Sequence, residues 1–100
     1  MIKRMIITRN PRENEVVVAS ADVFFEGGDK PLKEVAFVRK PHGLTVSLGR
    51  VVPGGVCARC HDIARQLLET LELAEAHYPG FERVQATFEN GDVFLSVCNY

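Results

Sequence analysis

The first half of the chain alternates apolar and polar residues at the period of a β-strand. The segment Ile2 to Thr8 is rich in β-forming residues, and a second segment, Glu15 to Phe25, follows a polar turn at residues 10–14. One side of this second segment carries an unbroken apolar row made of Val17, Ala19, Ala21, Val23 and Phe25. The opposite side is mixed, so we expect a central strand, or one covered in part on both faces.

Two more strands precede a change of period. Residues 34–40 follow the turn at residues 27–31, and Leu44, Val46 and Leu48 then alternate with polar or small residues. Apolar residues next recur at steps of three or four, which predicts one helix from about residue 56 to residue 78, ended by Pro79-Gly80. Its apolar stripe is Val56, Cys60, Ile63, Leu67, Leu71, Ala74 and Tyr78, and Leu73 points away from it.

The C-terminal segment predicts a β-hairpin. Asn90-Gly91 is the preferred pair for a two-residue type I′ turn. Placing the turn there pairs Phe88 with Val93, Ala86 with Leu95, and Val84 with Val97, all on one apolar face. The other face carries Phe94 and Tyr100.

The element order and the composition predict the fold class. A chain of 100 residues with 46% apolar and 25% charged residues is typical of one globular domain, so residues 1–100 are expected to form a single unit. We expect an α+β fold in the order ββββαββ: an antiparallel β-sheet, as one sheet or split in two, with one long helix packed on a face.

Charge and N-terminal patterning narrow the partners and the compartment. The net charge is -1 and the signs are interspersed, which predicts neither nucleic-acid nor membrane binding. The N-terminal residues lack the apolar region of a secretory signal. Three cysteines, an odd number, argue against a disulfide framework. We therefore expect a cytoplasmic protein.

One short segment, Cys57-Ala58-Arg59-Cys60-His61, carries residues that could take part in redox chemistry or bind a metal or haem. C-x-x-C-H is the attachment pattern for c-type haem, but haem is attached after export and in chains that are helical from the start. Without an export signal, and with strands before the motif, haem is disfavoured.

Thiol redox chemistry is a second interpretation of the cluster. Cysteines at positions i and i+3 of a first helical turn can form a disulfide, and the helix N-terminus stabilises a thiolate. Residues 57–64 resemble the active-site helix of the thioredoxin family in cysteine spacing and in the Ile63-Ala64 that follows. The tryptophan before the motif and the β-α-β unit of that family are absent. The resemblance implies a redox role for Cys57 and Cys60.

A metal site and a structural role are the remaining interpretations. Cys57, Cys60 and His61 suit zinc, which needs a fourth ligand, and Cys98 is the obvious candidate. Cys98 lies on the hairpin face opposite the apolar one, so a helix on the apolar face would keep Cys57 away from it. Free cysteines are also common in protein cores, so packing alone would explain Cys57 and Cys60 without any function.

The surplus apolar residues favour a role in protein binding. Phe94 and Tyr100 share the outer hairpin face, Phe24 lies on the second face of its strand, and Leu73 lies off the helical stripe. If they converge they form a docking patch, and otherwise a second layer of the core. No catalytic constellation is recognisable. The sequence therefore favours a small, non-enzymatic interaction or regulatory module that binds a protein partner or itself, with thiol redox or metal binding as the alternative.

Overall fold

A computed structural model describes residues 2–10, 16–27, 30–47 and 58–98 of the chain, and of residues 58–60 it describes the backbone. The elements are β1 (Ile2–Arg9), β2 (Val17–Phe25), β3 (Leu32–Lys40), β4 (Gly43–Ser47), α1 (Ala58–His77), β5 (Arg83–Glu89) and β6 (Asp92–Val97). The predicted α+β class and the order ββββαββ are confirmed.

All six strands belong to one antiparallel sheet with the order β4-β3-β2-β1-β5-β6. The sequence left open whether the sheet is split, and it is not. Strand β1 lies inside the sheet because it pairs with β2 on one side and with β5 on the other. The strands before and after the helix therefore meet at the β1–β5 pair, and β4 and β6 become the two edges.

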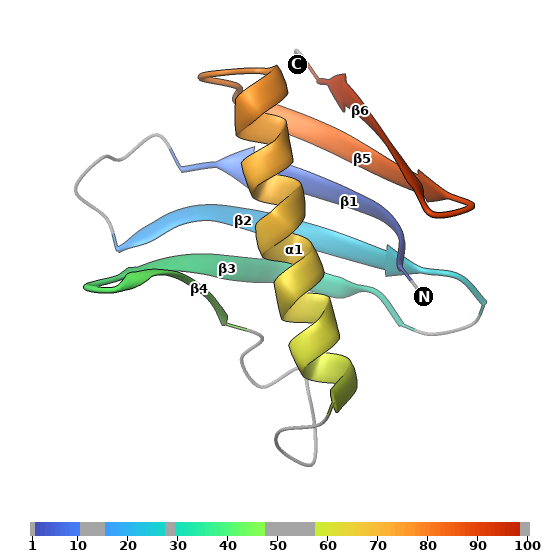
Figure 1. Ribbon diagram of the computed structural model, residues 1–100, viewed down its shortest axis with the longest axis horizontal. Coiled ribbons are helices and arrows are strands. Elements are labelled where there is room, and N and C mark those ends of the chain that lie inside the picture. The colour runs from blue at the N-terminus through green and yellow to red at the C-terminus, as the bar shows by residue number, and fades with distance from the viewer. Residues whose placement is uncertain (1, 11–15, 28–29, 48–57, 99–100) are drawn as a thin grey trace.

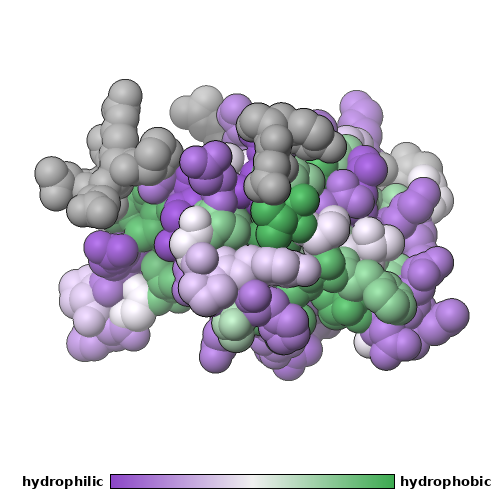
Figure 2. Space-filling view, turned by 90° about the horizontal axis from the view of Figure 1, so that it is seen from above, coloured by the Kyte–Doolittle hydropathy of each residue, from purple (hydrophilic) through white to green (hydrophobic). Residues whose placement is uncertain are grey.

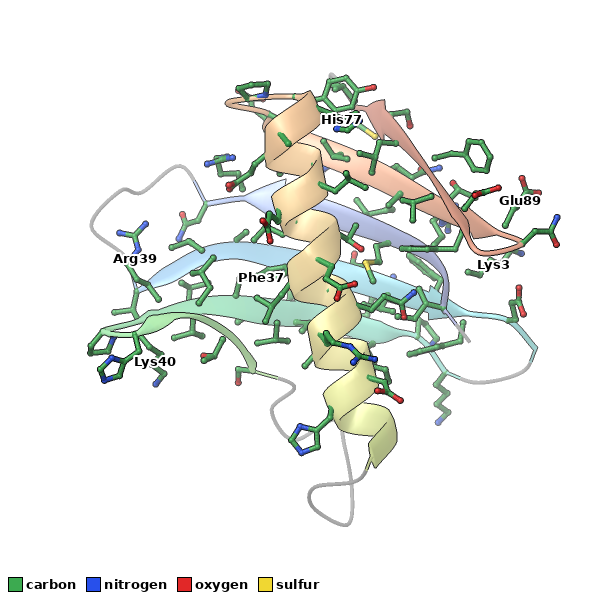
Figure 3. All side chains as sticks on the ribbon, viewed as in Figure 1. Lys3, Phe37, Arg39, Lys40, His77 and Glu89 are labelled. Atoms are coloured by element: carbon green, nitrogen blue, oxygen red, sulfur yellow. The ribbon has the colours of Figure 1, made fainter. Side chains whose placement is uncertain are left out.

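Helix α1 lies against one face of the sheet and runs across the strands (Figure 1). The core between them is formed by apolar residues of α1 and of the inner strands, and Phe37, which is fully buried, lies beneath the helix (Figure 3). Its other members are Ile2, Met5, Ile7, Ala19, Ala21, Val23, Leu32, Val35, Leu67, Leu71, Ala74, Phe81, Val84 and Ala86. Where the structure describes the predicted helical stripe, at Ile63, Leu67, Leu71, Ala74 and Tyr78, each residue is in or against this core.

The C-terminal hairpin has the register predicted from its turn. Phe88 pairs with Val93, Ala86 with Leu95, and Val84 with Val97. Asn90 and Gly91 have φ angles of 51° and 83°. A type I′ turn needs positive φ at both central residues, which asparagine and glycine adopt most readily.

Two irregularities break the apolar row that the sequence predicts along β2. The register with β3 shifts between Val17 and Ala19, so Val17 is exposed and Val18 packs against the core instead. A second shift lies opposite Asp22, where Glu34 adopts a φ of 55° and its backbone N–H donates to Asp22 Oδ1 at 2.9 Å. The row was thus predicted correctly from Ala19 to Val23 and at Phe25, which packs against the core, and wrongly at Val17, because a bulge reverses the side-chain alternation.

Arg9 links the end of β1 to the end of the helix. Its Nε donates to the carbonyl oxygen of Phe81 at 3.1 Å, and its Nη2 lies 3.1 Å from Glu75 Oε1. The guanidinium also lies over the Phe81 ring, 4.8 Å from its centroid. These contacts fix where α1 ends relative to the sheet.

The core assignment predicts how much the free energy of unfolding falls when Val23, in β2, or Val16, just before β2, is shortened to alanine. Val23 is 0% exposed and Val16 is 58% exposed. We expect Val23→Ala to lower the free energy of unfolding by about 2–3 kcal/mol, because it removes buried apolar atoms and leaves a cavity. Val16→Ala should change it by less than about 0.5 kcal/mol. Urea unfolding of both variants measures the difference, and equal effects would contradict the assigned core.

Candidate functional site

Helix α1 covers only the middle of the strands it crosses. A nine-residue strand such as β2 is about 30 Å long, whereas a helix with its side chains is about 10–12 Å wide. Because α1 runs across the strands, both ends of the sheet extend beyond it on the same face (Figure 1). A hollow follows on each side of the helix.

The hollow on the side of the hairpin turn has an apolar floor. Its volume is about 520 Å³, and Leu73, Phe88 and Val93 contribute its apolar lining. Gln66, Glu69 and Thr70 of α1 form its polar wall. A second hollow of about 450 Å³ shares Ile2, Gln66 and Glu69 with it, so the two continue one another along the helix. We call these two hollows together the hairpin-side groove.

The hollow on the opposite side of α1 is smaller. Its volume is about 300 Å³, and Arg9, Arg39 and Glu75 are among its lining residues, with Leu44 and Leu71. Arg9 and Glu75 are already paired there. This side therefore offers less free apolar surface than the hairpin-side groove.

Strand β6 exposes apolar side chains on both of its faces. Val93 and Val97, on the helix side of the sheet, are 36% and 37% exposed, and Phe94, on the other side, is 55% exposed. Figure 2 looks from above onto the end of the molecule that carries β6 and shows apolar surface there among polar groups. Residues 93–97 contain neither a charged residue nor a proline. Monomeric proteins usually protect an edge strand with such residues, and β6 has none between its ends.

Every second residue of β6 directs its backbone groups away from β5. In a hairpin closed by a two-residue turn, the residues flanking the turn exchange hydrogen bonds, and every second residue beyond them does the same. Asp92, Phe94 and Ser96 therefore face β5, and Cys98 N–H continues the ladder by donating to the Arg83 carbonyl oxygen at 2.9 Å. Val93, Leu95 and Val97 direct their N–H and C=O groups outward, where the described chain places no further strand.

Phe24 lies on the face of the sheet that α1 does not cover, between two cations. The Arg4 guanidinium carbon and the Lys33 Nζ are each 4.4 Å from its ring centroid. Strands β1 and β5 separate it from Phe94, a distance of about 14 Å at the usual strand spacing. Phe24 and Phe94 share a face without touching, Leu73 lies on the opposite face, and Tyr100 lies outside the described residues.

The cation contacts of Phe24 are testable by a double-mutant cycle with Arg4→Met and Phe24→Leu. We expect a coupling free energy of about 0.5–1 kcal/mol, the usual value for a cation over a solvent-accessible ring. Arg83→Met is the matched control, because the Arg83 Nε donates to Thr8 Oγ1 at 3.3 Å and not to the ring. Phe24→Leu combined with Arg83→Met should be additive in urea unfolding. Coupling of the same size in both cycles would contradict a specific contact.

The cysteine cluster is described only in part. Cys57 and the side chain of Cys60 lie outside the described residues, whereas the backbone of Cys60 lies in the first turn of α1 and His61 is exposed. Cys98 lies beside Gly80 and Phe81, just beyond the other end of the helix. The helical path from Cys60 to His77 is about 25 Å long, so Cys98 lies far from the first turn of α1. Within the described part of the chain, no group of three metal-ligating side chains comes together.

Buried polar chemistry is sparse in the core. Among the residues whose side chains are described, Thr70 is the only buried polar one, and its hydroxyl donates to the Gln66 carbonyl oxygen at 2.7 Å. That bond is the ordinary one of a helical threonine to the preceding turn. The buried Thr70 hydroxyl therefore has its hydrogen-bond partner within the helix.

The fold and the site define an α+β protein with a six-stranded antiparallel sheet, one helix across it, and an uncharged stretch of edge strand beside a groove with a mixed apolar and polar lining. The comparisons with known proteins add no relative: no family model, curated protein or solved structure matches the chain. In the described residues, no helix is both long enough and apolar enough to span a membrane.

The structure places two of the apolar residues that the sequence singled out beside the groove or on its neighbouring strand. These are Leu73, in the groove, and Phe94, on β6. Sequence reasoning assigned Val93 and Val97 to the apolar hairpin face without recognising that they remain about one-third exposed. The helix diameter was the available signal, because one helix cannot cover every apolar row of six strands.

Proposed function

We propose that this protein is a non-enzymatic protein-interaction module that binds its partner through β6 and the adjoining hairpin-side groove. The exposed, uncharged edge of β6 carries this proposal. Three alternate residues, Val93, Leu95 and Val97, direct backbone donors and acceptors outward, and apolar side chains lie on both faces of the strand. Strand addition uses these two features together: the main chain supplies affinity and the alternating side chains supply specificity.

A protein partner suits this surface better than a small molecule does. Small-molecule sites are concave pockets in which a few polar groups converge on the ligand. The hairpin-side groove instead extends along α1 and opens toward the β5–β6 turn, with Asn90 and Gly91 at its end. Its length and its continuity with an unpaired strand favour an extended polypeptide.

We further propose that the protein acts in the cytoplasm. An odd number of cysteines supports a compartment in which thiols stay reduced. The interspersed charge supports a protein partner over nucleic acid or an anionic membrane.

Site-specific photocrosslinking tests the interaction. Phe94→benzoylphenylalanine places a photoreactive aromatic group on β6 at an exposed position. After irradiation in intact cells, we expect a discrete protein adduct on a denaturing gel. The same substitution at Glu72, an exposed position of α1, is the control and should give no adduct. Equal yields at positions 94 and 72 would show that β6 binds no protein specifically.

Thiol redox or zinc chemistry at Cys57, Cys60 and His61 is the second candidate. The observation in its favour is that α1 begins at Ala58, which places the backbone of Cys60 in the first helical turn. The positive end of the helix dipole stabilises an anionic sulfur there.

This candidate predicts a mass difference in native mass spectrometry. Protein purified without reductant or chelator should carry either bound zinc or a disulfide, and Cys57→Ser/Cys60→Ser should carry neither while keeping its melting temperature. Cys98→Ser is the matched control and should retain the modification. An unmodified chain with three free thiols would remove this candidate, and a large drop in melting temperature would assign the cysteines to the core.

A further inference from the structure

The outward groups of β6 are complementary to a second β6 running in the opposite direction. Val93, Leu95 and Val97 alternate along the edge with Leu95 at the centre. A two-fold axis through Leu95 places Leu95 opposite itself and Val93 opposite Val97 of the second copy. Every pairing then joins two outward-facing residues, which are the hydrogen-bonding pairs of an antiparallel ladder.

We propose that the partner of β6 is a second copy of this chain, added antiparallel with Leu95 opposite Leu95. The inference rests on the proposed function, since both require that the β6 edge binds protein. Three residue pairs exchange both of their bonds, which gives about six main-chain hydrogen bonds across the junction. A closed two-fold pair also removes β6 as a free edge.

The side chains match in this register. On the helix side of the sheet, Val93, Leu95 and Val97 of one copy meet Val97, Leu95 and Val93 of the other. An axis perpendicular to the sheet keeps both helices on the same face, so this apolar strip lies between them. The exposed parts of Val93 and Val97 then become covered, and burying apolar surface is favourable.

The charges are compatible with the pairing. No charged residue lies within residues 93–97, so no like charges meet at the centre of the junction. Glu89 and Asp92 lie at the turn of one hairpin, and Figure 3 shows Glu89 at that outer end. The same register places them in one row with Arg83 of the second copy, because Arg83 pairs with Cys98 and Cys98 would stand opposite Asp92. Asp92 of one copy and Arg83 of the other then lie about 10 Å apart between their Cα atoms, two strand spacings, while the Arg83 Nε donates to Thr8 Oγ1 on the side away from the junction.

One existing contact has to coexist with the junction. The Tyr78 hydroxyl donates to the Leu95 carbonyl oxygen at 3.4 Å, which is long for an O–H···O bond. A carbonyl oxygen has two lone pairs and can accept a second hydrogen bond from the Leu95 N–H of the second copy. The Leu95 carbonyl oxygen therefore has the capacity to bond both Tyr78 and the second copy.

The other edge strand is less suited to the same pairing. In β4, only Leu44 and Val46 alternate outward, because Lys40 pairs with Gly43 at the turn and Thr45 with Val38. The strand has five residues against six in β6, and Arg39 and Lys40 stand at its turn (Figure 3). The difference that favours β6 is that three of its residues direct their N–H and C=O groups outward, against two in β4.

Charge substitutions at positions 93 and 97 test both the partner and the register by sedimentation velocity. The unmodified chain of 11.1 kDa should sediment with twice that mass at micromolar concentration. Val93→Lys/Val97→Lys places lysine opposite lysine at both ends and should weaken association at least tenfold. Val93→Glu/Val97→Lys places glutamate opposite lysine and should restore association to within a few fold of the unmodified chain.

The controls separate folding, location and register. Val16→Lys adds a charge at an exposed position away from β6 and should leave association unchanged. Circular dichroism melting should show that both doubly substituted variants fold. A dimer that tolerates the two lysines would refute pairing at β6, and failure of the glutamate–lysine variant to recover would refute the Leu95-centred register.

The experiments distinguish failure of the self-pairing proposal from failure of the proposed protein-binding function. A chain that stays monomeric up to about 100 µM would overturn self-pairing. Its dissociation constant would then exceed about 100 µM, which means a binding free energy weaker than about 6 kcal/mol. If the photoreactive variant at position 94 then gives an adduct with a different protein, the proposed function stands without self-pairing. If it gives no adduct, both are wrong.

Discussion

One helix packs on a sheet of six strands, and it is too narrow to cover the whole face of that sheet. The rest of the structure depends on this difference in area. Burial of apolar surface under α1 supplies the core around Phe37, Met5 and Leu67, where the helix crosses the sheet. The strands are longer than the helix is wide, so the same packing leaves apolar side chains at both sides of α1 only partly covered. The hairpin-side groove and the exposed parts of Val93 and Val97 are thus consequences of the core's own geometry.

On the face of the sheet that α1 does not cover, two phenylalanines differ in how far their rings are shielded from water. On the face without a helix, Phe24 is sandwiched between Arg4 and Lys33, which shield the ring while keeping their charges in water. Phe94 lies on the same face with more than half of its surface exposed. Strand β6 therefore combines exposed apolar side chains on both of its faces with an edge backbone, and this coincidence makes it the centre of the proposed interaction.

The position of β6 depends on where the second half of the chain joins the first. Because β5 pairs with β1, the hairpin extends the sheet outward and its last strand becomes an edge. Arg9 holds this arrangement at the far end of the helix by contacting both Glu75 and Phe81. This connectivity leaves β6 open to the strand addition proposed above.

The sequence by itself determined the elements and the local registers. Alternation at period two, the stripe at period 3.6 and the Asn90-Gly91 turn depend on neighbouring residues, so they fixed the α+β class, the helix and the pairing of Val84, Ala86 and Phe88. Only the tertiary structure decided the strand order, the bulges at Val17 and Glu34, and which apolar residues stay exposed. These depend on contacts between distant segments, and a residue pattern records which side is apolar without recording how far a helix reaches across it. Leu73 and Phe94 could be singled out because they break their local patterns, whereas Val93 and Val97 obey theirs and are exposed by the limited width of α1.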